Sequence, residues 1–183
     1  MSYLQINDPN FKQKSKYSGY CFEIFDCELP EVDENTKKRT IIFHQGLSLI
    51  IPILSLEKIV LVKQFRYGAD IELWELPAGI INKNESPIEC AKREMKEETG
   101  YISEAWRELI SFWVSPQYST ETIHCFLANQ LIKTEHIVDL HEISEVRIFS
   151  LEKIKTMINN GQIRDAKTLA AICYYLIDID NKG

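Results

Sequence analysis

The sequence lacks the features that mark secreted, membrane-spanning and low-complexity proteins. Its five cysteines include no CxxC pair, so it has neither a zinc knuckle nor a dithiol redox motif, and an odd, unpaired set favours a reducing compartment. Only seven glycines and six prolines occur in 183 residues, which excludes collagen-like and disordered chains. The longest largely apolar run, residues 47–54, is far below the roughly 18 residues that span a bilayer. The first residues show no basic start followed by an apolar run, so we expect no signal peptide and a cytoplasmic protein that contacts no membrane.

Basic residues are also fewer than acidic ones. The 21 Lys and Arg residues face 27 Asp and Glu residues, which gives a net charge of −6. An acidic protein is a poor candidate for sequence-independent binding to nucleic acid, so we expect no such partner. If the substrate is itself anionic, something other than net charge must hold it, and a divalent cation is the usual answer.

What the sequence does contain is the pattern of a single α+β protein. Residues 20–29 and 40–44 predict two strands joined by a polar turn, which together form an amino-terminal β-hairpin. Residues 46–54 and 58–65 are nearly continuous apolar runs, which are typical of central strands covered on both faces.

The helix with the clearest boundaries is expected over residues 86–99. Ser86 is a candidate N-cap, Pro87 stands at the first helical position, and Glu89 completes a capping box. Gly100 is the natural stop at the carboxyl end.

Strands at about 106–114 and 122–128 follow this helix. Two more helices are expected, one over 151–160 and one over about 165–177. The order of strands, helix, strands and two helices predicts an α+β fold with a mixed sheet between helical layers.

The predicted helix over 86–99 carries an unusual cluster of acidic residues. Glu94, Glu97 and Glu98 stand at i, i+3 and i+4, so their side chains are neighbours and repel one another by a few tenths of a kcal/mol per pair, on the order of the usual helix value. A solvated acidic face is the simple interpretation. Arg93 inside the cluster and Glu85 in the preceding loop favour another, because closely spaced carboxylates are what a hard divalent cation such as Mg²⁺ or Mn²⁺ prefers.

The run from Gly79 to Tyr101 resembles a complete Nudix box. The family's pattern is Gly, five residues, Glu, seven residues, and then Arg-Glu-aliphatic-any-Glu-Glu-any-Gly-aliphatic. Here Gly79, Glu85 and the run REMKEETGY at 93–101 match every fixed position. The resemblance implies an α/β/α sandwich built on a mixed sheet.

The resemblance also implies the reaction. Nudix hydrolases cleave a nucleoside diphosphate linked to another group between its two phosphates, with Mg²⁺ or Mn²⁺ as cofactor. Two or more ions per active site are expected, because this is two-metal phosphoryl chemistry in which the cations neutralise the diphosphate and activate water.

Each matched position receives a role from the resemblance. The implied metal ligands are the carbonyl of Ala78 and the carboxylates of Glu94, Glu97 and Glu98. Glu97 and Glu98 are also expected to be catalytic, Glu97 by binding metal or by orienting its water. The residues expected to hold the loop and helix in shape are Gly79, Glu85, Arg93 and Gly100.

Outside the box, four runs resemble the ADP-ribose pyrophosphatase branch of the family. They are HQGLSLIIPI, VKQFRYGADIELWELPAG, SPQYSTE and GQIRDAKTLAA. Pro116 lies fifteen residues past Tyr101, as in that branch, although Gln117 replaces the usual Gly after it. GDP-mannose hydrolases share the SP loop and the GxIRDxKT run, so they stay an alternative. A domain that binds a nucleotide sugar without turnover is a third interpretation, but such domains typically lose a box carboxylate.

Three further assignments follow from the branch. Arg66 is expected to bind the substrate phosphate, and Glu75 is expected near the substrate or the metals, so that Arg66, Glu75 and Pro116 form the predicted substrate site. Glu142 is expected to be the catalytic base or an additional metal ligand, with Glu135 and Glu145 as competing positions in the same region.

Related enzymes use an amino-terminal extension to dimerise. We therefore expect residues 1–43 to form a hairpin extension that joins a homodimer and contributes to the partner's substrate pocket. Residues 44–183 are expected to form the Nudix hydrolase domain. The predicted substrate is a nucleotide sugar, with ADP-ribose preferred over GDP-mannose.

Overall fold

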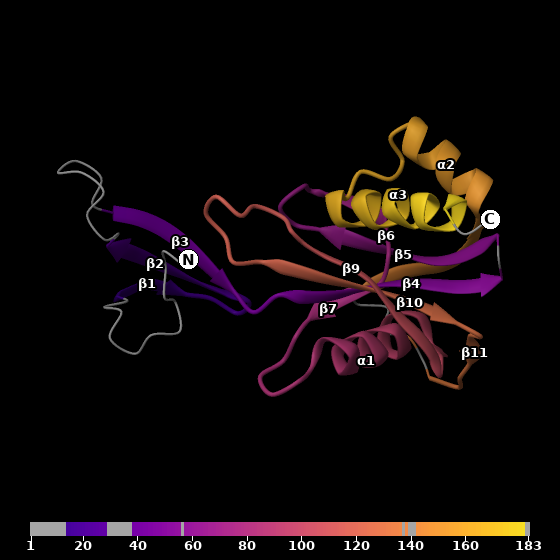
Figure 1. Ribbon diagram of the computed structural model, residues 1–183, viewed down its shortest axis with the longest axis horizontal. Coiled ribbons are helices and arrows are strands. Elements are labelled where there is room, and N and C mark those ends of the chain that lie inside the picture. The colour runs from indigo at the N-terminus through magenta and orange to yellow at the C-terminus, as the bar shows by residue number, and fades with distance from the viewer. Residues whose placement is uncertain (1–13, 29–37, 56, 137, 139–141, 182–183) are drawn as a thin grey trace. The chain divides into compact units, whose positions relative to one another are not determined.

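The computed structural model describes residues 14–28, 38–55, 57–136, 138 and 142–181. By its internal contacts the chain divides into two units. The smaller unit comprises Met1–Gly46 and Trp113–Thr122, and the larger comprises Leu47–Phe112 and Ile123–Gly183. Figure 1 shows the elements of both.

The smaller unit contains an antiparallel three-stranded sheet. Its strands are β1 (Lys14–Ser18), β2 (Phe22–Glu28) and β3 (Lys38–His44), in the order β1-β2-β3. The hairpin formed by β2 and β3 confirms the sequence prediction. We did not expect β1, because its sequence KSKYS is polar and carries no alternating apolar signal.

The segment 113–122 binds to the β3 edge of this small sheet. The backbone N–H of Ile42 donates to the carbonyl of Tyr118 at 2.8 Å, and the N–H of His44 donates to the hydroxyl of Thr120 at 2.9 Å. The loop that carries Pro116 is therefore attached to the sheet by hydrogen bonds that satisfy backbone donors of β3.

The larger unit contains nine strands and three helices among its described residues. In chain order they are β4 (Leu47–Ser55), β5 (Lys58–Arg66), β6 (Ile71–Glu75), β7 (Ala78–Ile80), α1 (Pro87–Thr99), β8 (Tyr101–Ile102), β9 (Ala105–Trp113), β10 (Thr122–Asn129), β11 (Ile132–Lys133), β12 (Ile143–Ser150), α2 (Leu151–Asn159) and α3 (Ala166–Asp180).

Seven of these strands form one mixed sheet. Its order is β12-β5-β4-β10-β9, with β6 paired to β5 and β7 paired to β4. Strands β4 and β10 run parallel, whereas β5 pairs antiparallel with β4, β6 and β12. The expectation of a mixed sheet is confirmed, and both strands predicted from apolar runs, β4 and β5, lie inside it.

Alternation along β4 supplies the cores on both faces of the sheet. Leu49 and Ile51 belong to one buried cluster, together with Ile172 of α3, whereas Ile50 belongs to a second cluster with Met95 of α1. Successive side chains of a strand point to opposite faces, so one strand serves both layers. Full burial of each large side chain is worth about 1.5–3 kcal/mol.

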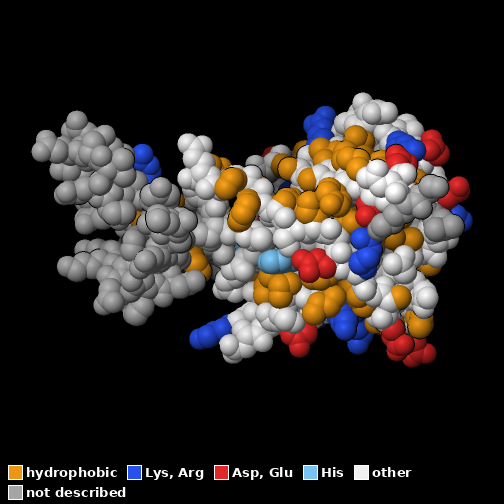
Figure 2. Space-filling model, in the orientation of Figure 1, with side chains coloured by type: hydrophobic (Ala, Val, Ile, Leu, Met, Phe, Trp, Pro, Cys, Tyr) orange, Lys and Arg blue, Asp and Glu red, His pale blue; other side chains and the backbone are white. Residues whose placement is uncertain are grey.

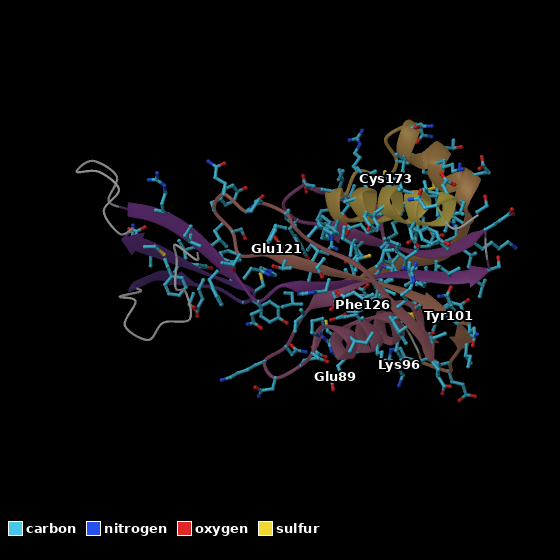
Figure 3. The ribbon with its side chains drawn as sticks, in the orientation of Figure 1. Glu89, Lys96, Tyr101, Glu121, Phe126 and Cys173 are labelled. Atoms are coloured by element: carbon cyan, nitrogen blue, oxygen red, sulfur yellow. The ribbon has the colours of Figure 1, made fainter. Side chains whose placement is uncertain are left out.

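Helix α1 lies on one face of the sheet, and α2 and α3 lie on the other (Figure 1). In Figure 3, Phe126 of β10 lies above α1, between this helix and the sheet, while the exposed Glu89 and Lys96 are labelled on α1 itself. The α/β/α sandwich implied by the Nudix resemblance is confirmed.

The boundaries of α1 are those that its sequence predicts. The Ser86 hydroxyl accepts from the Glu89 N–H, and the Glu89 carboxylate accepts from the Ser86 N–H at 2.8 Å. Gly100 adopts φ +69°, a left-handed conformation that favours glycine, and its N–H donates to the Lys96 carbonyl at 2.9 Å. Caps of this kind contribute about 1 kcal/mol and fix the rotation of the helix, and with it the direction of its carboxylates.

Helices α2 and α3 confirm the two carboxyl-terminal predictions. Helix α3 extends to Asp180, three residues beyond the expected end at Ile177. The apolar periodicity stops near Ile177, but no glycine or proline follows there to end the helix.

Figure 2 shows that hydrophobic side chains are interspersed with acidic and basic ones on the visible face of the larger unit. None of the helices in the described residues combines the length and the apolar character that crossing a membrane requires.

Candidate active site

The loop between β7 and α1 is tied to the helix by Arg93. Its Nε donates to Oε1 of Glu85 at 2.8 Å, and its Nη2 donates to Oε2 of Glu85 at 3.0 Å and to the carbonyl of Ile80 at 3.2 Å. The hydrogen bond from Arg93 is the main cause that lowers the pKa of Glu85. Glu85 also accepts from the backbone N–H of Asn82 at 2.9 Å, so the pair joins the loop to the first half of the helix. The structure thus brings together two residues that the box predicts to be structural.

The same guanidinium reaches the acidic cluster. Nη1 of Arg93 donates to Oε1 of Glu94 at 2.5 Å and to Oε2 of Glu97 at 3.1 Å. The side chain of Glu94 is only 14% exposed, whereas that of Glu97 is 51% exposed. Arg93 therefore compensates part of the repulsion that the spacing of the three glutamates creates.

Glu98 is the buried member of the cluster. Its Oε1 accepts from Nε2 of Gln64 at 3.2 Å, and its Oε2 accepts from the backbone N–H of Ala78 at 2.9 Å. Burial raises the pKa of Glu98 to about 8, and the negative charges of Glu94 and Glu142 add to the rise, against the lowering effects of the Ala78 N–H and Arg66. Within the described residues no basic side chain forms an ion pair with it.

These residues fit a divalent cation. Their donor atoms are all oxygens, the glycine at position 79 leaves the space that the Glu94 carboxylate occupies, and Glu98 is a buried acid without a paired cation. As the side chains stand, no three His, Cys, Asp or Glu residues of the described ranges converge as ligands of one ion, and Arg93 holds two of the carboxylates. Glu94, Glu97, Glu98 and the Ala78 carbonyl are the groups that would hold the metal.

Arg66 and Glu75 face each other across the β5–β6 pair. Nε and Nη2 of Arg66 donate to the two oxygens of Glu75 at 2.8 and 2.7 Å, and the Glu75 side chain is almost fully buried. The hydrogen bond to Glu75 is the main cause that raises the pKa of Arg66. Glu75 thus holds the arginine in place, and the negative charge of Glu98 also acts on that arginine.

A second basic side chain, Lys167, lies near the Glu75 carboxylate, and the sequence analysis did not predict it. Nζ of Lys167, at the start of α3, lies 3.7 Å from Oε2 of Glu75 and 2.5 Å from Oδ1 of Asp165. The hydroxyl of Thr168 accepts from the backbone N–H of Leu76 at 3.0 Å. The run GQIRDAKT, which contains Asp165, Lys167 and Thr168, was the available signal, because it places charged residues at a helix amino terminus.

The remaining predicted residues are placed as follows. Glu142 is exposed and immediately precedes β12, and its charge acts on both Glu94 and Glu98. Its competitor Glu145 lies within β12 and pairs with Arg147, and Glu135 is exposed after β11. Pro116 lies in the smaller unit. Residues 139–141 of the loop before Glu142 are outside the described residues.

A cavity of about 570 Å³ elsewhere in the larger unit contains none of the box residues. It lies between α2 and α3, and its charged lining residues are Glu57, Glu152, Asp180 and Lys155. Three acids against one base do not suit a diphosphate, so this cavity is not the substrate site that the box predicts.

The fold and the site together define a class: a mixed-sheet sandwich whose loop and following helix present a cluster of carboxylates, the arrangement of a diphosphate hydrolase. The family model of the NUDIX domain matches residues 44–172. The chain belongs to the Nudix family, and it is a pyrophosphohydrolase. Nudix hydrolases generally use divalent metal ions.

Two relatives match nearly the whole chain, and a third matches about two thirds of it. The chain is 32% identical to an ADP-ribose pyrophosphatase of Bacillus subtilis (strain 168) and 38% identical to a methanol dehydrogenase activator of Bacillus methanolicus, in each case over 173 residues and 92% of both proteins. It is 34% identical to a GDP-mannose pyrophosphatase of Yersinia enterocolitica over 125 residues, 63% of this chain and 65% of the relative.

Among solved structures, a crystal structure of an ADP compounds hydrolase superposes with a TM-score of 0.77. The match covers 94% of each chain at 18% identity, so it supports the fold alone.

Proposed function

We propose that the protein is a Mg²⁺-dependent nucleoside diphosphate-sugar pyrophosphatase whose preferred substrate is ADP-ribose. The observation that carries the proposal is the buried carboxylate of Glu98, which lies beside Glu94 on a helix with a complete Nudix box and lacks a cation of its own. The Bacillus subtilis relative, matched over 92% of both chains, supports the choice of sugar nucleotide.

The proposed reaction consumes one water and gives AMP and ribose 5-phosphate. Attack of the water oxygen on either phosphorus of the diphosphate breaks one bond to the bridging oxygen and yields the same two products. A divalent cation bound at the carboxylates supplies charge neutralisation and lowers the pKa of water.

The protein's own groups then have separate tasks. The guanidinium of Arg66, aligned by Glu75, positions a phosphate oxygen, because a fixed fork of N–H donors matches phosphate geometry. Glu142 takes a proton from the attacking water as general base, which its exposed position before β12 and its electrostatic effect on Glu94 and Glu98 support. Arg93 and Glu85 keep the helix in register with the loop.

Two other functions have support of their own. Hydrolysis of GDP-mannose is favoured by the GDP-mannose pyrophosphatase relatives and by the run GQIRDAKT. Activation of a dehydrogenase is favoured by the 38% identity to the methanol dehydrogenase activator. Binding of a nucleotide sugar without turnover is disfavoured, because every box carboxylate is present.

We also propose that the protein is a cytoplasmic homodimer, with residues 1–43 as the dimerising extension and residues 44–183 as the catalytic domain. The three-stranded sheet formed by β1, β2 and β3 supports an extension of this kind, because it belongs to the smaller unit and not to the larger unit that carries the box.

The deciding experiment is a panel of nucleotide sugars incubated with the protein and Mg²⁺, followed by a phosphatase and measurement of the phosphate released. A phosphatase attacks the phosphomonoester products and not the intact diphosphate, so phosphate reports cleavage. The highest kcat/KM on ADP-ribose supports the proposal, and the highest value on GDP-mannose replaces it with the first alternative. Binding without release, measured by calorimetry, indicates the sensor. A separate assay adds the protein to a methanol dehydrogenase, and stimulation without nucleotide-sugar cleavage would favour the activator.

A further inference from the structure

The carboxylate of Glu98 is fixed by two neutral donors from two different elements. Nε2 of Gln64, on β5, donates to Oε1 at 3.2 Å, and the backbone N–H of Ala78, at the start of β7, donates to Oε2 at 2.9 Å. Each oxygen therefore accepts one hydrogen bond, and the two bonds together fix the orientation of the carboxylate. An ionised carboxylate offers about four lone-pair sites, so these two bonds leave two sites open.

Gln64 is itself placed with little freedom. Its backbone pairs with Leu73 of β6 on one side and with Ile143 of β12 on the other, and the residue is 5% exposed. It lies two residues after four buried apolar residues, 59–62, at a buried position where a polar side chain is unexpected. A buried amide without a partner costs free energy, and the partner of the Gln64 amide N–H is Glu98.

The Gln64 amide is a neutral donor, and this distinguishes the surroundings of Glu98 from those of Glu94 and Glu97. Glu94 and Glu97 accept hydrogen bonds from the guanidinium of Arg93, which compensates their charge. Among the described residues, Glu98 receives hydrogen bonds from an amide and a backbone N–H, which orient it without cancelling its charge. No basic side chain among the described residues forms an ion pair with Glu98, so a bound cation would face no competing pair, in an orientation that the protein sets beforehand.

We propose that Gln64 is a positioning residue that orients the Glu98 carboxylate for cation binding. The inference rests on the proposed function, because Glu98 is there a metal ligand. Partners that orient metal ligands typically change metal affinity or activity by about 10–100-fold when they are removed. Gln64 touches neither substrate nor metal in this role, so its loss falls on cation affinity and kcat and leaves the KM for the nucleotide sugar nearly unchanged.

The test variant is Gln64→Met, which keeps the length and volume of the side chain but removes the N–H donor. Mn²⁺ is titrated calorimetrically into metal-free protein, and kcat and KM are measured with Mg²⁺ on the best nucleotide sugar of the wild type. The Kd for Mn²⁺ should rise by about 10–100-fold, and kcat should fall by a similar factor. The matched control is Ser103→Ala, which removes hydrogen bonds to Ala105 and Asn129 in another loop; it should alter the melting temperature and leave Mn²⁺ affinity unchanged.

A second variant guards against misfolding of the first. Gln64→Asn keeps the amide but draws it back by one carbon, so the nitrogen no longer reaches Glu98, and it should also weaken Mn²⁺ binding. Wild-type Mn²⁺ affinity in either folded variant would overturn the inference and leave Gln64 as a structural residue. If the wild-type protein binds no Mn²⁺ and cleaves no nucleotide sugar, the proposed function itself fails, and that outcome is visible before any variant is made.

Discussion

A Cβ atom on Gly79 would stand 1.8 Å from Oε1 of Glu94, so these two residues fit together only because position 79 has no side chain. The glycine of the box is therefore explained by the space that a carboxylate of α1 needs rather than by a positive φ angle. Its place in β7, opposite Ser48 of β4, fixes the backbone against which the glutamate packs.

Gly79→Ala should displace Glu94 and lower kcat by about 10²-fold, because a misplacement of about 1 Å at a reacting centre has an effect of that size. Steady-state kinetics with Mg²⁺ and a nucleotide sugar measure it. Gly68→Ala is the matched control, since a Cβ there would meet nothing within 4 Å. Equal activity of the two variants would show that Glu94 does not need its present position.

Glu98→Gln should lower turnover by several orders of magnitude with little loss of stability. The charge that a cation requires is removed, while the amide of Gln64 can turn to present its oxygen to the new side chain and keep a hydrogen bond. The measurements are kcat and the melting temperature, with the exposed Glu104→Gln as control. Activity above about a tenth of wild type corresponds to less than about 1.4 kcal/mol and would exclude Glu98 as a metal ligand.

The stability of the metal-free protein should fall as pH rises from about 5 to about 8. Burial raises the pKa of Glu98 from 4.5 to about 8, so between these values the folded protein holds a proton that the unfolded chain has released. The stabilisation that this proton provides is complete below pH 4.5 and is lost as pH rises through about 8. Burial also raises the pKa of Glu94, which acts in the same direction.

Melting temperatures in EDTA across this range measure the effect in the wild type and in Glu98→Gln. The variant should show a smaller decrease, because its amide does not titrate. Parallel curves for both proteins would mean that another group causes the pH dependence.

Arg93→Ala should destabilise the protein by about 2 kcal/mol, the scale of hydrogen bonds to charged groups, and lower its melting temperature by roughly 4–8 °C. The loss of Glu85 and Ile80 as partners frees the loop from the helix, and activity should fall with it. Arg93→Lys should be intermediate, since it keeps the charge but not the bidentate contact. The control is Arg107→Ala, which breaks a more exposed pair with Asp178 and should cost under about 1 kcal/mol. An unchanged melting temperature with abolished activity would argue for direct contact between Arg93 and the phosphates.

The sequence predicted α1 and its carboxylates well, because the N-cap at Ser86, the stop at Gly100 and the i, i+3, i+4 spacing of the glutamates all lie within one short segment. The apolar runs of β4 and β5 likewise predicted central strands of the sheet. Strands β6 and β7 were not predicted, since five and three residues are too few to establish a period. The roles of Gln64 and Lys167 were also missed, because each is defined by a partner distant in the chain. Gln64 meets Glu98 34 residues later, and Lys167 reaches Glu75 only after α3 has packed on the sheet.

The general base is tested by comparing three glutamates. Glu142→Gln should lower kcat by about 10²–10⁴-fold, the usual range for loss of general-base catalysis, and leave KM nearly unchanged, because a group that activates water is needed only as the phosphorus is attacked. The charge of Glu142 acts on Glu94 and Glu98, which is consistent with a place near the carboxylates, whereas Glu145 is paired with Arg147. Glu135→Gln and Glu145→Gln should therefore be mild. A crippling effect at Glu145 would move the role there, and mild effects at all three would shift the activation of water to a group held by Glu97 or Glu98.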